Sequence, residues 1–303
     1  MPPKFDLLLN RPGVDRRAND RREVDLLPRL LADPDTNVLD WYAGRAPVRP
    51  DGTLAFRSPR SADQQALSIF LGAMHDGPAL LVVHPERAGD DVPVADLRTV
   101  GETLDDEQRS ILATAAGIAN WHATQGFCPQ DGSPTVPVEA GWARQCAAEE
   151  HHHYPRTDPA VIMSVIDPDD RLLLAQGTRF GTREGEIPRM SVLAGFVEPG
   201  ESLAAAVARE VQEEVGVSVR DAQYLGDQPW PFPASLMIGY VAYTDAPALD
   251  TDPHEIVAAR WFTRDELTDD LRAERIGVPP RLSIARHLIE HWYGGPLPVA
   301  TRW

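Results

Sequence analysis

Cysteine, basic residues and long hydrophobic runs are all scarce in this chain. Only Cys128 and Cys146 occur among 303 residues, which leaves no disulfide framework. No stretch approaches the roughly 20 consecutive apolar residues of a membrane helix. The 29 Lys and Arg are outnumbered by 46 Asp and Glu, and the net charge of −17 disfavours broad electrostatic binding of nucleic acid. We therefore expect a cytoplasmic protein that makes no membrane contact.

The residues that are present suffice for folded cores. Apolar residues make up 43% of the chain, and its length predicts two domains with a small third module. We expect an N-terminal α/β domain over residues 1–123, a short module over 124–154 and a catalytic domain over 155–303. In the first region, residues 79–84 predict a strand and 105–122 a helix with one apolar face. It shows no catalytic constellation, so we assign it a role in support or dimerisation, with a duplicate of the catalytic domain that has lost its activity as the alternative origin.

The catalytic region predicts strands and helices in a mixed sheet flanked by helices. A P-D-D turn joins the first two strands into a hairpin. The expected strands are 160–167, 171–176, 191–196, 217–224, 235–244 and 257–262, and a closing helix covers 283–292.

The most informative run is GFVEPGESLAAAVAREVQEEVGV, residues 195–217. Residues 202–215 contain neither Pro nor Gly and are rich in helix formers, while Gly216 is a typical helix terminator. Apolar residues recur at every fourth position of this helix, which predicts a stripe that holds it on a core.

Three glutamates on the predicted helix point to a metal site. Glu210, Glu213 and Glu214 stand at i, i+3 and i+4, so their carboxylates share one face. Carboxylates together with water suit Mg²⁺, which also binds substrate phosphates and lowers the pKa of a bound water for attack at phosphorus. An isolated E-x-x-E-E is more often a solvated helix face, but the matched glycines, the arginine and the preceding loop reverse that preference.

This spacing resembles the Nudix box, the signature of hydrolases that cleave a nucleoside diphosphate linked to another group. The pattern Gly-x5-Glu-x7-Arg-Glu-aliphatic-x-Glu-Glu-x-Gly-aliphatic is met at every specified position. The resemblance implies a Nudix α/β/α sandwich. It further implies that Arg209 orients Glu201, and that Gly195 and Gly216 allow tight turns at the two ends of the box.

A second run, QPWPFPAS at residues 228–235, follows eleven residues after the box. Its three prolines make the segment 229–233 stiff and non-helical, so a rigid loop can present Trp230 and Phe232 as flat surfaces for a planar base. Taken alone, such a loop more often caps a core. Together with GFVE at 195–198, the run resembles the NADH pyrophosphatase subfamily of Nudix hydrolases, although Asp227 stands where that subfamily has Ser.

The resemblance implies hydrolysis of the pyrophosphate of NAD(H) to NMN(H) and AMP, with Mg²⁺ or Mn²⁺. Glu210, Glu213 and Glu214 would bind the metal, Glu214 would also activate water, and Glu255 would lie near the metals. The implied substrate-binding residues are Phe196 and Tyr154 at the nicotinamide ring, and Gln228, Trp230, Ser235, Ile162 and Ala285 in the nucleotide pocket. The family forms homodimers with sites near the interface, and an NAD-capped RNA 5′ end is a secondary substrate.

The short module has the spacing of a zinc ribbon with an altered ligand set. Cys128-x2-Asp131 and Cys146-x2-Glu149 place an acidic residue where a four-cysteine ribbon has its second thiolate. Aspartate and glutamate can bind zinc, but two hard ligands weaken such a site.

Two interpretations of the module remain open. The neighbouring His151, His152 and His153 offer alternative ligands; otherwise the module is a relic that hydrogen bonds hold without metal. We expect a weak zinc site or none, with packing of Trp142 and Tyr154 as the support.

Two other functions compete with NAD(H) hydrolysis. One is a Nudix hydrolase for another dinucleotide or for ADP-ribose, which a reshaped pocket around Asp227 would favour. The other is a non-catalytic nucleotide-binding regulator, against which the intact E-x-x-E-E argues.

Overall fold

The computed structural model describes residues 6–86, 88–89, 91–178 and 186–298. The chain forms two compact units. The C-terminal unit contains the chain through Asn10, Asp158–Gln228 and the chain from Leu236 onward, and the N-terminal unit contains Arg11–Thr157 and Pro229–Ser235. This division differs from the three predicted regions in two places. The chain through Asn10 belongs to the C-terminal unit, and the Pro–aromatic segment Pro229–Ser235 belongs to the N-terminal unit.

A six-stranded sheet forms the centre of the C-terminal unit. Its order is β12-β13-β9-β10-β14, with β11 paired to β9. The strand β9 is buried over most of its length, as its continuous apolar sequence predicts for a central strand. The strands are β9 (Asp158–Ile166), β10 (Leu172–Gly177), β11 (Leu193–Phe196), β12 (Asp221–Trp230), β13 (Ser235–Tyr243) and β14 (Ile256–Phe262).

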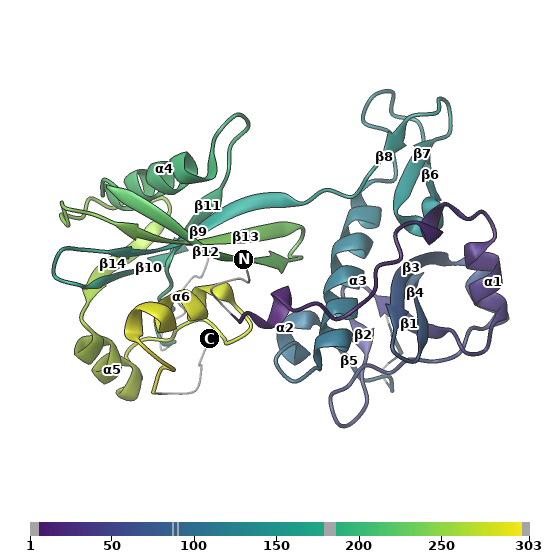
Figure 1. Ribbon diagram of the computed structural model, residues 1–303, viewed down its shortest axis with the longest axis horizontal. Coiled ribbons are helices and arrows are strands. Elements are labelled where there is room, and N and C mark those ends of the chain that lie inside the picture. The colour runs from purple at the N-terminus through teal and green to yellow at the C-terminus, as the bar shows by residue number, and fades with distance from the viewer. Residues whose placement is uncertain (1–5, 87, 90, 179–185, 299–303) are drawn as a thin grey trace. The chain divides into compact units, whose positions relative to one another are not determined.

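Helices cover both faces of this sheet (Figure 1). On one face, α4 (Leu203–Val215) buries Val207 and Val211 against alternate residues of β9 and β10. On the other, α5 (Arg264–Arg272) and α6 (Ile284–Tyr293) bury Leu267 and Leu288. Each buried side chain of this size contributes about 1.5–3 kcal/mol. The predicted α/β/α sandwich is confirmed.

Local signals set the ends of α4. The Ser202 hydroxyl accepts a hydrogen bond from the amide of Ala205 at 3.3 Å and caps the first turn. Gly216 ends the helix at φ 71°, a left-handed conformation that glycine adopts without strain. The box helix is therefore defined by its own sequence at both ends.

The strand predicted at 217–224 lies later in the chain than expected. β12 begins at Asp221 and continues to Trp230, so the first half of the QPWPFP run is strand and only residues 231–234 form a turn. Pro229 is tolerated there because β12 is an edge strand, which needs no backbone donor on its free side.

The N-terminal unit has a three-stranded sheet of its own, in the order β1-β4-β3. β1 runs parallel to β4, and β3 runs antiparallel to it. The strands of this sheet are β1 (Asn37–Tyr42), β3 (Leu67–Met74) and β4 (Gly77–His84), while β2 (Ala46–Pro47) and β5 (Val94–Ala95) pair in a separate two-stranded sheet. The helices of this unit are α1 (Leu26–Ala32), α2 (Leu97–Val100) and α3 (Asp106–Thr124). Short 3-10 turns occupy Leu8–Asn10, Asp20–Arg22, Ser61–Gln65 and Glu139–Gly141.

A small sheet within the N-terminal unit carries Cys146 and lies against α3, and Cys128 lies in the loop that precedes its first strand. We call this sheet, together with that loop and the segment up to His151, the cysteine-bearing sheet. Its order is β6 (Thr135–Val138), β7 (Ala143–Cys146) and β8 (His152–His153). The buried His122 of α3 donates from Nε2 to the Gly141 carbonyl at 2.8 Å and accepts at Nδ1 from Arg144 at 2.9 Å. Acceptance at Nδ1 requires a neutral ring, and burial, with a smaller contribution from the Arg144 charge, lowers the pKa of His122 to about 4 although the Gly141 carbonyl opposes the shift. The buried ring is therefore an uncharged imidazole at neutral pH.

Only one of the two aromatic residues expected to support the module does so. The indole of Trp142 donates to the Phe70 carbonyl at 2.6 Å and packs under the guanidinium of Arg21. Tyr154, in contrast, is 60% exposed, so the expectation that its packing supports the module is wrong. Among the helices that the structure describes, none is both long enough and apolar enough to cross a membrane.

Candidate active site and ligand cluster

Four glutamates of the C-terminal unit line one cavity of about 510 Å³. Glu198 follows β11, Glu210 and Glu214 project from α4, and Glu255 immediately precedes β14. Glu210 and Glu214 are 9% and 8% exposed, so both carboxylates are largely withdrawn from bulk water. The fold thus gathers acidic side chains from three separate stretches of the chain into one pocket.

Gly195 is required for close packing and not for a turn. It lies within strand β11, contrary to the expectation above. A Cβ built on Gly195 would stand 1.8 Å from the carboxyl carbon of Glu210. Because only glycine leaves this space free, Gly195 lets the Glu210 carboxylate rest on the strand.

Arg209 organises the acidic cluster from one side. Its guanidinium binds both carboxylate oxygens of Glu201, each at 2.9 Å, and donates to the Phe196 carbonyl at 2.8 Å. It also reaches Glu210 at 2.8 Å and Glu213 at 3.0 Å. This bidentate pairing lowers the pKa of Glu201, with help from the Glu198 amide. Arg209 therefore ties the loop before α4 to the helix.

The three glutamates of the E-x-x-E-E motif have different surroundings. The side chain of Glu213 is 60% exposed, pairs with Arg209 and is absent from the described lining of the cavity. Burial raises the pKa of Glu210, even though Arg209 opposes the shift, and Glu213 and Glu255 raise it further by repulsion. A cation placed among these carboxylates would relieve the repulsion.

The predicted substrate-binding residues are divided by the fold. Phe196 lines the cavity and is 58% exposed. Ile162 and Ala285 are instead buried together in the core between the sheet and α6. Gln228 is fully buried, and neither polar atom of its side-chain amide has a hydrogen-bond partner within the described chain. None of these last three belongs to the described lining of the cavity.

The aromatic pair of the second run is held by the N-terminal unit. Trp230 and Phe232 meet edge to face with ring centroids 4.9 Å apart. The guanidinium of Arg98 lies 3.9 Å from the Phe232 ring centre, a cation–π distance. Asn120 of α3 donates its amide to the carbonyls of Pro231 and Pro233 at 3.0 and 3.1 Å. Ser235, at the end of this run, is buried.

Several residues of the cavity were not among those predicted from the sequence. Glu198 and His254 line it within two positions of the predicted Phe196 and Glu255, and Thr178 lines it from the end of β10. Glu198 was visible as the last residue of the GFVE run, two positions after Phe196. Asn120 carried no signal, because its partners lie 111 and 113 residues away.

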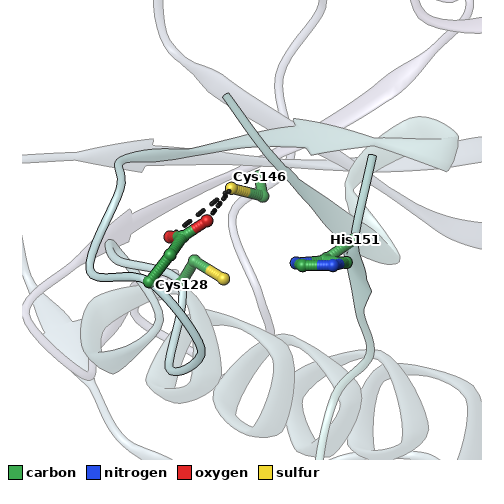
Figure 2. A group of neighbouring side chains, drawn as sticks. Cys128, Cys146 and His151 are labelled. Atoms are coloured by element: carbon green, nitrogen blue, oxygen red, sulfur yellow. Dashed lines mark hydrogen bonds between the residues drawn. The ribbon is translucent and has the colours of Figure 1, made fainter. Parts of the chain in front are cut away.

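A second ligand cluster lies in the small cysteine-bearing sheet. The ligand atoms of Cys128, Asp131, Cys146 and His151 all lie within 4.8 Å of one another. Figure 2 shows the Cys128 and Cys146 side chains converging, with the His151 ring facing them from the other side. The Cys146 thiol donates to the Asp131 carboxylate at 3.3 Å. Glu149, predicted as the fourth ligand, contacts the Nε2 atom of His151 at 3.2 Å and is not part of the group.

The acid–base state of this cluster follows from its hydrogen bonds. The Ser133 amide and the Cys146 thiol lower the pKa of Asp131 to about 2. The Glu149 amide favours the thiolate of Cys146, but burial and the Asp131 carboxylate outweigh it and raise the pKa of that thiol. In the absence of a cation, the proton therefore resides on sulfur and the negative charge on Asp131.

Comparison with known proteins matches all three regions. Residues 29–121 match the NADH pyrophosphatase-like rudimentary NUDIX domain, 123–154 the NADH pyrophosphatase zinc ribbon domain and 156–282 the NUDIX domain. The NAD-capped RNA hydrolases NudC of Mycobacterium bovis and Mycobacterium tuberculosis are each 37% identical, over 94% of this chain and 94% of their own. The human NAD-capped RNA hydrolase NUDT12 is 42% identical over 202 residues, which are 62% of this chain and 42% of that protein.

The bacterial similarity includes both compact units, and the matched domains follow the order in which the sequence analysis placed them. The box helix and the carboxylate cavity lie inside the residues that match the NUDIX domain. The cysteine-bearing sheet lies inside those that match the zinc ribbon domain. This chain belongs to the NADH pyrophosphatase (NAD-capped RNA hydrolase) family of Nudix hydrolases.

Proposed function

We propose that this protein hydrolyses the pyrophosphate bond of NAD(H) to NMN(H) and AMP, and that it removes NAD caps from RNA 5′ ends. The supporting observation is the cavity that gathers Glu198, Glu210, Glu214 and Glu255, in a chain that is 37% identical to NAD-capped RNA hydrolases over 94% of its length. One water is consumed, so one phosphate remains on each nucleoside half. On a capped RNA, the same cut leaves a 5′-monophosphate end.

The cavity suits the divalent metal that a Nudix domain implies. Its acidic donors are all oxygen atoms, which favour a hard cation such as Mg²⁺ or Mn²⁺. The cavity is lined by four glutamates and by a single arginine, Arg209. Because Arg209 also binds Glu201, which is outside the lining, it does not neutralise the four carboxylates. When bound, such a cation neutralises phosphate charge and makes water a stronger nucleophile.

The side chains take separate tasks in this proposal. Glu210 and Glu214 hold the metal with Glu255, and Glu214 takes the proton from the attacking water. Arg209 keeps Glu210 in place and fixes Glu201 at the helix entrance, so we assign it a positioning role. Glu213 is a weaker candidate ligand, because Arg209 holds its exposed carboxylate outside the cavity lining.

The aromatic pair supports recognition of the dinucleotide. Trp230 and Phe232 are only partly buried and are fixed in position by Arg98 and Asn120, so their rings are preorganised for a base at little entropic cost. Asp227, the departure from the subfamily pattern, is accommodated on its own strand. Its carboxylate accepts a hydrogen bond from the Tyr224 hydroxyl. Burial, and to a smaller extent this carboxylate, raises the pKa of Tyr224 to about 12.

Product analysis with NADH tests the proposal directly. Incubation with NADH and Mn²⁺ should yield NMNH and AMP in equal amounts, and Glu214→Gln should serve as the inactive control. ADP-ribose and a diadenosine dinucleotide, compared at steady state, would identify a different Nudix specificity. Release of free nicotinamide would refute cleavage at the pyrophosphate, and no turnover with either metal would indicate a nucleotide-binding regulator.

Three further properties belong to this proposal. We expect a homodimer, which light scattering of the purified chain would measure. The sequence alone predicts a weak zinc site or none, but two thiols, a carboxylate and an imidazole converge in the cysteine-bearing sheet, so we propose that it holds one structural Zn²⁺. We also expect a cytoplasmic location, which cell fractionation would test.

A further inference from the structure

We propose that His151 is the fourth zinc ligand, through Nδ1, and that Glu149 holds its ring in place from outside the site. The inference rests on the proposal that the cysteine-bearing sheet holds zinc. It departs from the sequence pattern, in which Glu149 occupies the position of a fourth thiolate. It concerns only the metal in this sheet, so it stands apart from hydrolysis in the C-terminal unit.

The backbone explains why the ligand is displaced by two residues. The turn after β7 closes with a hydrogen bond from the Cys146 amide to the His151 carbonyl at 2.9 Å. This contact brings His151 back beside Cys146, while the Glu149 amide faces the Cys146 sulfur at 3.5 Å. The Glu149 backbone amide thus points at the Cys146 sulfur, and the Glu149 side chain lies outside the group of four ligand residues.

The two ring nitrogens of His151 have different surroundings. Nε2 lies 3.2 Å from the Glu149 carboxylate. Nδ1 is buried and has no hydrogen-bond partner within the described chain. An unpaired buried ring nitrogen costs free energy unless something binds it, and it belongs to a residue whose ligand atom lies within 4.8 Å of two sulfurs and a carboxylate.

The carboxylate outside the group completes the arrangement. A zinc-binding histidine commonly donates its other ring N–H to a carboxylate, which fixes the tautomer and strengthens the metal bond. Glu149 meets that requirement, since Nε2–H can donate to it while Nδ1 keeps its lone pair free. Glu149, which stands where a four-cysteine ribbon has its last thiolate, therefore orients the ligand His151 and does not bind the metal itself.

The other ligand positions are already formed. Cys128 and Cys146 are 2% and 4% exposed and both are free thiols. The Asp131 carboxylate is fixed by the Ser133 amide at 2.8 Å and by the Cys146 thiol. Binding of zinc would displace the thiol protons, so the Cys146–Asp131 hydrogen bond would give way to two metal bonds. Because a carboxylate and an imidazole replace two thiolates, we expect weaker binding than at a four-cysteine ribbon.

Metal titration of matched variants tests this assignment. The full chain would be stripped with chelator under reducing conditions and titrated with Zn²⁺ and Co²⁺, with metal content, Co²⁺ absorption and histidine ring NMR as readouts. The wild type should bind one ion per chain in the sheet, in tetrahedral geometry, with the His151 ring metallated at Nδ1. Variants in the sheet should leave NADH hydrolysis chemistry unchanged, which separates this test from that of catalysis.

The variants distinguish the ligand from its partner. His151→Ala should weaken zinc binding at least 100-fold and abolish the tetrahedral spectrum, while Glu149→Gln should weaken it by about 10-fold and keep that spectrum. Glu150→Gln and His152→Ala, both exposed neighbours, should bind like the wild type. Loss of the site in Glu149→Gln with retention in His151→Ala would make Glu149 the ligand. Loss in His153→Ala alone would assign that residue instead, and a wild type without zinc would overturn the site itself.

Discussion

The two ligand clusters of this protein differ in donor chemistry and surroundings, as the proposed catalytic and structural roles require. The cavity of the C-terminal unit offers four carboxylates in about 510 Å³ of open space. The cluster of the N-terminal unit offers two sulfurs, one carboxylate and one imidazole within 4.8 Å. Hard oxygen donors leave coordination positions for water and phosphate, whereas a compact set of four mixed ligands closes around the ion.

The clusters also differ in how the chain produces them. The acidic cavity uses one helix plus two residues that the sheet brings to it, so its ligands depend on the tertiary fold. The cysteine-bearing cluster lies within residues 128–151, where backbone hydrogen bonds from Gly132 to Cys128 and from Cys146 to His151 close the two loops that carry its ligands. We therefore expect loss of metal from the first to stop turnover without unfolding, and loss of metal from the second to weaken the fold without changing the chemistry.

The largest effect should follow from a change in the cavity. Glu214→Gln removes a proposed metal ligand that is also the proposed base, so kcat should fall roughly 10²- to 10⁴-fold, with a melting temperature close to that of the wild type. Glu213→Gln is the matched control on the same helix, and it should lose much less because Glu213 contacts Arg209 outside the lining. Equal losses in the two variants would place Glu213 among the metal ligands.

A stability effect should distinguish the N-terminal unit at acid pH. Burial lowers the pKa of His122 to about 4 from a usual 6.5, so the folded state disfavours protonation. Stability should be constant above about pH 6.5 and should decline as pH falls toward 4, by up to about 3 kcal/mol. Thermal unfolding across this range would measure the decline, and His122→Gln should flatten it. An unchanged slope in that variant would assign the decline to other groups.

A smaller, selective effect should follow from loss of the aromatic surface. Trp230→Ala should raise KM for NADH roughly 10-fold through lost stacking, with kcat less affected because the carboxylate cavity is untouched. A substrate that lacks nicotinamide should suffer less. A uniform loss on all substrates would mean that the aromatic pair serves only to join the segment to its unit.

The smallest effect should come from the residue that positions this segment. Asn120→Ala removes two hydrogen bonds to the carbonyls of Pro231 and Pro233, each worth about 1 kcal/mol. We expect a few-fold increase in KM for NADH and the same product pattern, measured by steady-state kinetics. Asn120→Asp should be worse than Ala, since a carboxylate faces two carbonyl oxygens. Unchanged KM in both variants would exclude a positioning role.

The sequence by itself determined the family, the helix that carries the glutamates of the E-x-x-E-E motif and the presence of a ribbon-like module. Ser202 and Gly216 bound that helix locally, and strict spacing places Glu210 and Glu214 one turn apart. These features depend on neighbours within one helical turn or one tight turn, so a pattern of letters is enough to predict them.

Only the tertiary structure decided which of these residues come together. Gly195 meets Glu210 across the gap between a strand and a helix, and the segment at Pro229–Ser235 joins the unit of Asn120, more than a hundred residues earlier. His151 replaces Glu149 in the ligand cluster because the chain folds back to hydrogen-bond with Cys146. Contacts of this kind depend on packing between distant elements, and spacing along the sequence carries no record of them.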